Sequence, residues 1–166
     1  MKYRSRFLYW ADIFLSSTNL PAYVVASFVK RFSRLALIAS VETLYPLIPL
    51  IGNLLIRHPN LMELFNKSTS DEYQNDPFRF EETNLKDTRA LESSLWELKS
   101  LQRHWNQTIR KEAKFINYTL PKDEFDLSDL LDVDFPMLVE AAFSAEVDDN
   151  VELNVDIGQV ALEFFN

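Results

Sequence analysis

Glycine is almost missing from this chain, and its scarcity limits the folds open to it. The 166 residues include two glycines, Gly52 and Gly158. An all-β domain of this length needs many tight turns, and glycine supplies the backbone conformations that such turns require. We therefore predict an all-α fold. A hydrophobic content of 47% suffices for one domain with a packed core.

Apolar residues recur at helical spacing along the N-terminal half. The first predicted helix covers residues 4–16, and the second covers about 21–38. The first places four apolar residues on one face: Phe7, Trp10, Ala11 and Phe14. The second buries an apolar stripe, with Lys30, Arg31 and Arg34 on its other side; the stripe comprises Val25, Phe28, Val29, Phe32, Leu35 and Ala36.

A third helix is predicted from about Val41 to Arg57, with Pro46 and Pro49 delaying its regular start or kinking it. A short helix follows at Leu61–Phe65. The polar residues 66–75 are the best candidate for a flexible loop.

Ala90–Leu101 is predicted as one amphipathic helix that ends near Arg103. Leu91, Leu95 and Leu98 lie at the i, i+4, i+7 spacing of one helix stripe. The opposite side suits solvent and carries Glu92, Ser93, Glu97, Lys99 and Arg103.

Three further helices are predicted towards the C-terminus. Asn106 caps the first, Ser128–Leu131 forms a short acidic one, and Pro136 begins the last. Helices joined by short connections are typical of an antiparallel, HEAT-like α-solenoid, although no internal repeat is strong enough to establish one.

The charges are divided unevenly along the chain. Residues 1–60 carry a net charge of +5 and residues 61–166 a net charge of −13, and thirteen acidic but no basic residues follow Lys122. Such an acidic end attracts basic proteins and repels nucleic acid. The alternative interpretation is a solvated tail that only keeps the protein soluble. One hypothesis is that the acidic helix faces a basic partner through Asp126, Asp129 and Asp132.

The tail after residue 143 changes its pattern from helical to alternating. Residues 151–157 alternate apolar and polar side chains, which predicts an extended strand, and an apolar end follows. A single strand is not stable alone, so we expect the tail to fold back on the domain or to pair with a partner chain. Its candidate contact residues are Val151, Leu153, Val155, Ile157, Leu162, Phe164 and Phe165.

Residues suited to catalysis or cofactor binding do not form a recognisable pattern. The chain has no cysteine, two histidines at positions 58 and 104, and no glycine-rich phosphate loop. We therefore expect no enzyme, no cofactor and no metal site. The cluster of Lys30, Arg31 and Arg34 is the candidate for RNA contact, although its neighbouring aromatic residues belong to the core stripe.

Neither a signal peptide nor a membrane span is predicted. The basic residues at the start are not followed by a clean apolar run or a small-residue cleavage site. The most apolar stretch, Leu35–Ile56, contains Glu42 and two prolines, so we expect a buried core helix there.

The order of several short blocks resembles a known family. Asp76-Pro77-Phe78, the block ALESSLWEL at 90–98 and the block LQRHW at 101–105 are similar to the C-terminal region of the nucleolar complex protein 4 family. That family belongs to the CCAAT-binding-factor (CBF) domain proteins of ribosome assembly. Supporting matches upstream and downstream extend the resemblance to about residues 20–143.

The resemblance implies a function, a place and a partner. It implies a scaffold in small (40S) ribosomal subunit biogenesis, located in the nucleus and nucleolus, that binds nucleolar protein 14 within the pre-ribosomal processome and supports rRNA processing and subunit export. It also implies that this chain is a fragment of a longer protein, with a helical CBF-type domain at 1–143. The acidic tail at 144–166 has no counterpart in the family's pattern and is predicted from its residues alone. The alternative is an RNA-binding module that contacts pre-rRNA through the basic N-terminal half.

Overall fold

The computed structural model describes residues 3–66, 75–118 and 120–144. The chain divides into two units, residues 1–135 and 136–166. All regular elements of the described residues are helices, and no strand occurs among them, which confirms the all-α prediction. The predicted strand at 151–157 lies outside the described residues.

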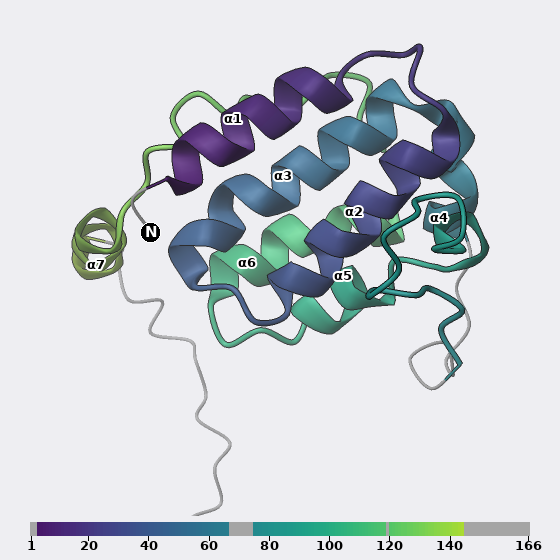
Figure 1. Cartoon of the computed structure of the whole chain (residues 1–166). Coiled ribbons are helices and arrows are strands. Elements are labelled where there is room, and N and C mark those ends of the chain that lie inside the picture. The colour runs from purple at the N-terminus through teal and green to yellow at the C-terminus, as the bar shows by residue number, and fades with distance from the viewer. Residues whose placement is uncertain (1–2, 67–74, 119, 145–166) are drawn as a thin grey trace, which may run out of the picture. The chain divides into compact units, whose positions relative to one another are not determined.

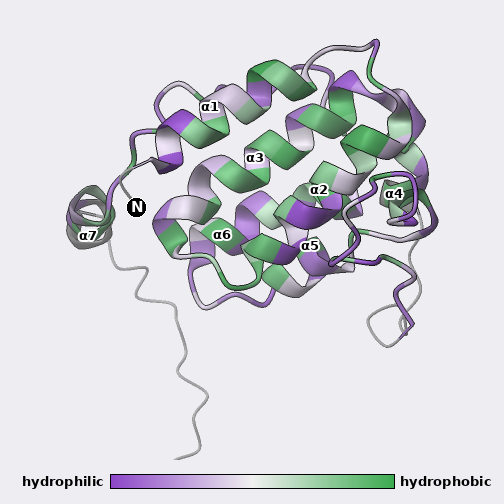
Figure 2. Cartoon of the chain, viewed as in Figure 1, coloured by the Kyte–Doolittle hydropathy of each residue, from purple (hydrophilic) through white to green (hydrophobic). Residues whose placement is uncertain are grey.

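Three long helices form the first layer of the larger unit. They are α1 (Arg4–Leu15), α2 (Ala22–Ala36) and α3 (Val41–Arg57), and they run alternately in opposite directions with α3 between the other two (Figure 1). Figure 2 shows α3 coloured as apolar along most of its length, in keeping with its burial. The sequence predicts that Pro46 and Pro49 delay the start of this helix or kink it. The first alternative is wrong, because α3 already begins at Val41.

Short helices form the second layer. They include α5 (Trp96–Leu101) against α2, α6 (Gln107–Glu112) against α3, and the 3₁₀ helix η3 (Ala113–Asn117) against α5. Asn106 caps α6 as predicted, because its Oδ1 accepts a hydrogen bond from the Ile109 N–H at 3.1 Å. The larger unit also contains η1 (Pro59–Leu61), α4 (Met62–Asn66) and η2 (Ala90–Glu92). The described part of the smaller unit is helix α7 (Phe135–Ser144).

The predicted helix Ala90–Leu101 is wrong as a single element. The structure has one 3₁₀ turn at Ala90–Glu92, extended backbone at Ser93 and a separate helix from Trp96. The interruption has a use, because it frees the Ser94 carbonyl to accept a hydrogen bond from Lys30 Nζ at 2.6 Å. Ser93 Oγ in turn donates to Asp76 Oδ1 at 2.5 Å.

A buried charge network joins α2 to this interrupted segment. Lys30 Nζ lies 2.6 Å from Glu97 Oε1 and 3.1 Å from Asp76 Oδ2. Arg34 pairs with the same two carboxylates at 2.7 Å and 2.9 Å, and its guanidinium stacks over the ring of Trp96. These five residues, Lys30, Arg34, Asp76, Trp96 and Glu97, are called the α2 charge network below.

Asp76 has the largest number of partners in the network. Besides the two cations, it accepts hydrogen bonds from the Trp96 indole N–H at 2.8 Å and the Phe78 amide at 3.0 Å. Burial alone would raise the pKa of Asp76, but the bond from Ser93, the charge of Lys30 and the bonds from Trp96 and Phe78 lower the pKa to about 2. For Glu97, burial outweighs the two cations and raises the pKa.

The network overturns the predicted orientation of α2. The sequence predicts that Lys30 lies on the solvent side of this helix. In the structure its side chain is 0% exposed, which is incompatible with contact to an RNA phosphate. Glu97 and Ser93 were also assigned to solvent and are buried. The assignment fails because α2 is covered on two sides, by α3 on one and by the segment from Asp76 to Leu101 on the other.

The backbone of Phe125 is hydrogen-bonded to α3 through Asn53. The Asn53 side chain donates to the Phe125 carbonyl at 2.9 Å and accepts from the Phe125 N–H at 2.7 Å. At Gly52, an added Cβ would lie 2.7 Å from the Phe125 ring, so the glycine permits this close approach. Residues 128–132 then form turns, and the predicted helix at Ser128–Leu131 is wrong.

Removing the fully buried cation of the α2 charge network, Lys30, should destabilise the fold. In Lys30→Met, two buried carboxylates keep only Arg34 as counter-ion, so we expect the free energy of unfolding to fall by about 3–5 kcal/mol. Adding Glu97→Leu should recover part of the loss, since an apolar pair replaces a buried ion pair at little cost. Urea unfolding followed by tryptophan fluorescence measures both, with the exposed Lys111→Met as control; a Lys30→Met variant as stable as that control would contradict the role of the network.

The low pKa of Asp76 predicts a specific loss of stability in acid. Because the folded pKa of about 2 lies below the ordinary aspartate pKa of 3.8, the Asp76 carboxylate stabilises the fold above pH 4, and this contribution is lost as the pH falls towards 2. The difference corresponds to about 2 kcal/mol. The Asp76→Asn variant should lack this part of the pH dependence in urea unfolding between pH 5 and pH 2, and two parallel pH curves would refute the prediction.

Candidate protein-docking surface

Helix α1 turns large aromatic side chains towards solvent. Phe7 is 58% and Phe14 69% exposed, and Trp10 is also exposed, whereas Leu8 and Leu15 are buried against the core. The Trp10 and Phe14 rings lie 6.0 Å apart between centroids, whereas the Phe7 ring packs edge-on against Phe32 of α2 at 6.3 Å. The face that the sequence analysis singled out on this helix is therefore mostly a surface feature, and a different pair of residues anchors the helix.

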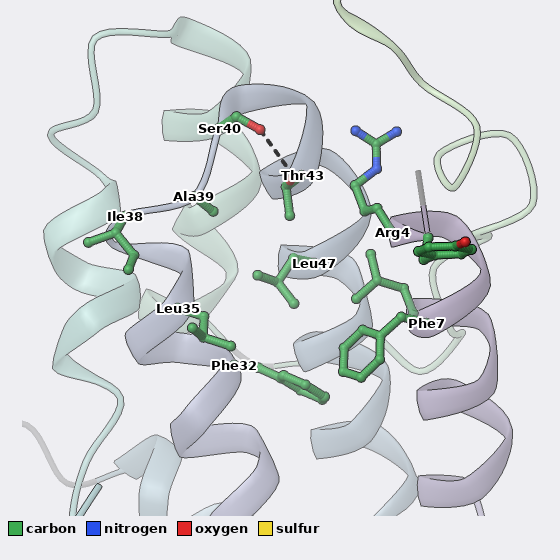
Figure 3. Close-up of a pocket in the computed structure, with 11 residues that line it drawn as sticks. Arg4, Phe7, Phe32, Leu35, Ile38, Ala39, Ser40, Thr43 and Leu47 are labelled. Carbon is green, nitrogen blue, oxygen red and sulfur yellow. Dashed lines mark hydrogen bonds between the residues drawn. The ribbon is translucent and has the colours of Figure 1, made fainter. Parts of the chain in front are cut away.

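An apolar groove lies beside this aromatic face. It has a volume of about 710 Å³ and is bounded by α1, the end of α2 and the start of α3. Figure 3 shows Phe7, Phe32, Leu35 and Leu47 around the same space, with Ile38 at its border. We call this hollow, together with the exposed face of α1, the apolar groove surface.

The groove has few polar groups, and they stand at its edge. Ser40 and Thr43 satisfy each other through a hydroxyl–hydroxyl hydrogen bond of 3.1 Å (Figure 3). Arg4 donates to the Val133 carbonyl and lies 3.7 Å from Glu42, but its Nε is buried without a hydrogen-bond partner among the described residues. A guest in the groove would thus find mainly apolar walls.

Continuous exposed apolar surface of this kind marks interaction sites in folded proteins. The end of α2 extends the surface, since Leu35, Leu37 and Ile38 are all exposed and Ile38 is 84% so. A groove between antiparallel helices is the shape that accepts a further amphipathic helix. The arrangement suits protein docking.

The predicted acidic contact residues do not form part of this groove surface. Asp126, Asp129 and Asp132 are all exposed, on the turns that follow Phe125. Asp126 accepts a hydrogen bond from the Ser128 N–H at 2.9 Å, and this bond lowers the pKa of Asp126. The predicted tail contacts Val151, Leu153, Val155, Ile157, Leu162, Phe164 and Phe165 lie outside the described residues. Their role and that of the three aspartates stay predictions.

Arg31 and Arg34, the other two residues of the predicted RNA cluster, make contacts within the fold. Arg31 donates to the Glu82 carbonyl, and Arg34 belongs to the α2 charge network. Both are partly exposed, so RNA contact through them stays a prediction, but without Lys30 the cluster loses its centre.

The described part of the chain contains neither a cluster of metal-ligating side chains nor a helix that could span a membrane. Within that part, no three His, Cys, Asp or Glu side chains come together as metal ligands would. The His58 ring is buried and lies 2.8 Å from the Leu15 carbonyl, which makes it a structural contact at the end of α3. Among the helices in that part, none is both long and apolar enough to cross a bilayer.

The sequence of α1 carries a signal for the groove surface in a second apolar stripe. Apolar residues surround α1 on more than one side, with Leu8 and Leu15 inside and Phe7 and Phe14 outside. A surface helix needs apolar residues on one stripe, so a second apolar stripe indicates a second contact face.

Comparison with known proteins gives a consistent family. The model of the CBF/Mak21 family matches residues 1–113. The chain is 46% identical over 147 residues to the nucleolar complex protein 4 homolog of Danio rerio, an alignment that covers 88% of this chain and 28% of the relative. It is 47% identical over 133 residues to the Homo sapiens homolog, covering 80% of this chain and 26% of the relative.

A Caenorhabditis elegans protein of uncharacterised function is 49% identical over 124 residues, which cover 75% of this chain and 25% of that protein. The chain therefore spans about a quarter of the length of these relatives.

The two faces of α1 predict opposite responses to substitution. Leu8→Ala removes a buried side chain and should lower the free energy of unfolding by about 2–5 kcal/mol. Phe14→Ala removes an exposed ring and should change it by less than about 0.5 kcal/mol. Urea unfolding of both variants checks this, and a Phe14→Ala loss as large as that of Leu8→Ala would show that the aromatic face is packed.

Proposed function

This chain belongs to the CBF/Mak21 family, and from that premise we propose that it is a non-enzymatic assembly factor of ribosome biogenesis whose apolar groove surface holds a partner protein. The names of its relatives place them in a nucleolar complex, which supports a nucleolar location for this chain. Because the chain corresponds to a quarter of those relatives, it would be one docking module of a longer scaffold.

The finer proposal concerns the particle and the partner. We propose that the module acts in small (40S) subunit biogenesis within the pre-ribosomal processome, where it binds nucleolar protein 14 and supports rRNA processing and subunit export. The resemblance noted in the sequence analysis is the support for this partner. The HEAT-like arrangement of the complete helical scaffold is part of the same proposal.

One observation carries the docking role: the apolar groove surface. Folded monomers rarely leave so many large apolar side chains in one continuous region, because each exposed one forgoes up to about 2 kcal/mol of burial. Their concentration on α1 and the end of α2 is explained when a partner covers them in the assembled particle.

The geometry also indicates the kind of segment that fits. An amphipathic helix would place alternate turns of apolar side chains between α1 and the end of α2, against Phe7, Phe32 and Leu35. We propose that the occupant is such a helix of nucleolar protein 14, with Asp126, Asp129 and Asp132 and the tail as secondary contacts.

A pair of substitutions in the groove tests the function. Phe7→Gln with Leu35→Gln removes apolar contact from two partly exposed positions, so the fold should persist while Kd for nucleolar protein 14 rises at least about tenfold. Trp105→Gln with Tyr118→Gln is the matched control, since it removes two exposed aromatic residues elsewhere and should leave Kd unchanged. Co-purification and size-exclusion at moderate salt, followed by calorimetric titration, give the values.

The outcomes separate the parts of the proposal. If the groove variant and the control bind equally well, the apolar groove surface is not the docking site. If the wild-type chain elutes separately from nucleolar protein 14 while well folded, the partner assignment for this module is wrong.

A further inference from the structure

We propose that the outward face of α6 and η3, together with Trp105, binds single-stranded RNA. The surface is distinct from the apolar groove surface and from the cluster of Lys30, Arg31 and Arg34. The choice of RNA among polyanions rests on the proposed function, whereas the binding surface itself does not.

The cations of the N-terminal half are largely neutralised within the fold. Lys30 and Arg34 belong to the α2 charge network, and Arg57 is held between Asp12 and Glu124. Arg4 lies near Glu42, and Arg31 donates to a backbone carbonyl. The net charge of +5 in residues 1–60 therefore leaves little positive surface for a nucleic acid.

The largest group of unneutralised cations lies further along the chain. Residues 103–122 carry five basic residues and one acidic residue, a net charge of +4 within a chain of net charge −8. All five basic side chains are exposed, and none forms an ion pair with another described residue. They are Arg103, Arg110, Lys111, Lys114 and Lys122.

Helical geometry places three of these cations on one face. The inward side of α6 and η3 consists of Ile109 and Ala113, both fully buried, followed by Ile116. Positions 110, 111 and 114 lie on the opposite side at this spacing, so Arg110, Lys111 and Lys114 form a cationic outward face.

Two exposed aromatic residues flank α6 and η3 in the sequence. Trp105 is 76% exposed just before α6, and Tyr118 is 67% exposed just after η3. The Trp105 ring packs on one side against His104 at 5.4 Å between centroids, and His104 Nδ1 accepts a hydrogen bond from the Asn106 N–H at 3.1 Å. Trp105 is thus held in place and available to a stacking base.

The combination favours a nucleic acid over an acidic protein. An acidic peptide would use the cations but not the rings, whereas single strands bind through cationic grooves combined with aromatic stacking platforms. The helical rise of α6 and η3 spans roughly 20 Å, which matches about six nucleotides at the 3.4 Å spacing of a stacked strand.

The test is fluorescence anisotropy of the whole chain with a fluorescein-labelled oligouridylate of about 12 nucleotides, twice the estimated span. The triple variant Arg110→Gln, Lys111→Gln, Lys114→Gln should bind at least tenfold more weakly and reduce the salt slope by about 2. Trp105→Ala should weaken binding roughly 5- to 100-fold, and Trp105→Phe should retain most of the affinity because it keeps a stacking ring.

A charge-matched control separates a site from general attraction. Arg6→Gln, Arg79→Gln, Lys86→Gln removes three exposed cations elsewhere and should cost less than threefold in affinity. The proposal is overturned if this control weakens binding as much as the α6 triple variant, if the wild-type chain leaves the anisotropy unchanged at low salt, or if polyglutamate displaces the RNA at equal charge concentration. Binding by the groove variant Phe7→Gln, Leu35→Gln should be unchanged, so failure of the docking proposal and failure of this one are distinguishable.

Discussion

The buried ammonium of Lys30 is the constraint around which the larger unit is arranged. A charge without solvent is tolerated when carboxylates and carbonyls surround it, and here Asp76, Glu97 and the Ser94 carbonyl supply them. Because these groups must reach Lys30, the segment from Asp76 to Leu101 lies over α2. The same segment is interrupted at Ser93, between η2 and α5. The same covering makes α2 a central helix and leaves α1 as the outer one.

The long helices were predictable because their signals are local. The bounds of α1, α2 and α3 follow from apolar spacing and from breakers such as Pro59, and the Asn106 cap lies three residues from its partner. The charge network was not predictable by the same means, because Lys30 meets Asp76 and Glu97 across 46 and 67 residues. A charged residue opposite an apolar stripe reads as solvent-exposed unless the distant partner is known.

The candidate surfaces show a similar division. The acidic residues Asp126, Asp129 and Asp132 are exposed as the sequence suggested, yet the apolar groove surface arises from three helices and from no single segment. Likewise, the charge of the N-terminal half suggests a nucleic-acid surface there, but Arg4, Lys30, Arg31, Arg34 and Arg57 are engaged in contacts within the fold. Which cations remain available depends on the fold and not on the count of basic residues.

The long-range pairing of Lys30 also has a consequence for synthesis of the chain on the ribosome. When α3 ends at Arg57, the carboxylate of Glu97 has not yet been made, and about 2 to 8 s of translation separate the two positions. During this interval Lys30 lies on the side of α2 that the segment from Asp76 to Leu101 later covers, so its ammonium stays hydrated while α3 packs on the other side. We therefore expect the ammonium to be enclosed last, after the chain through Leu101 has left the exit tunnel.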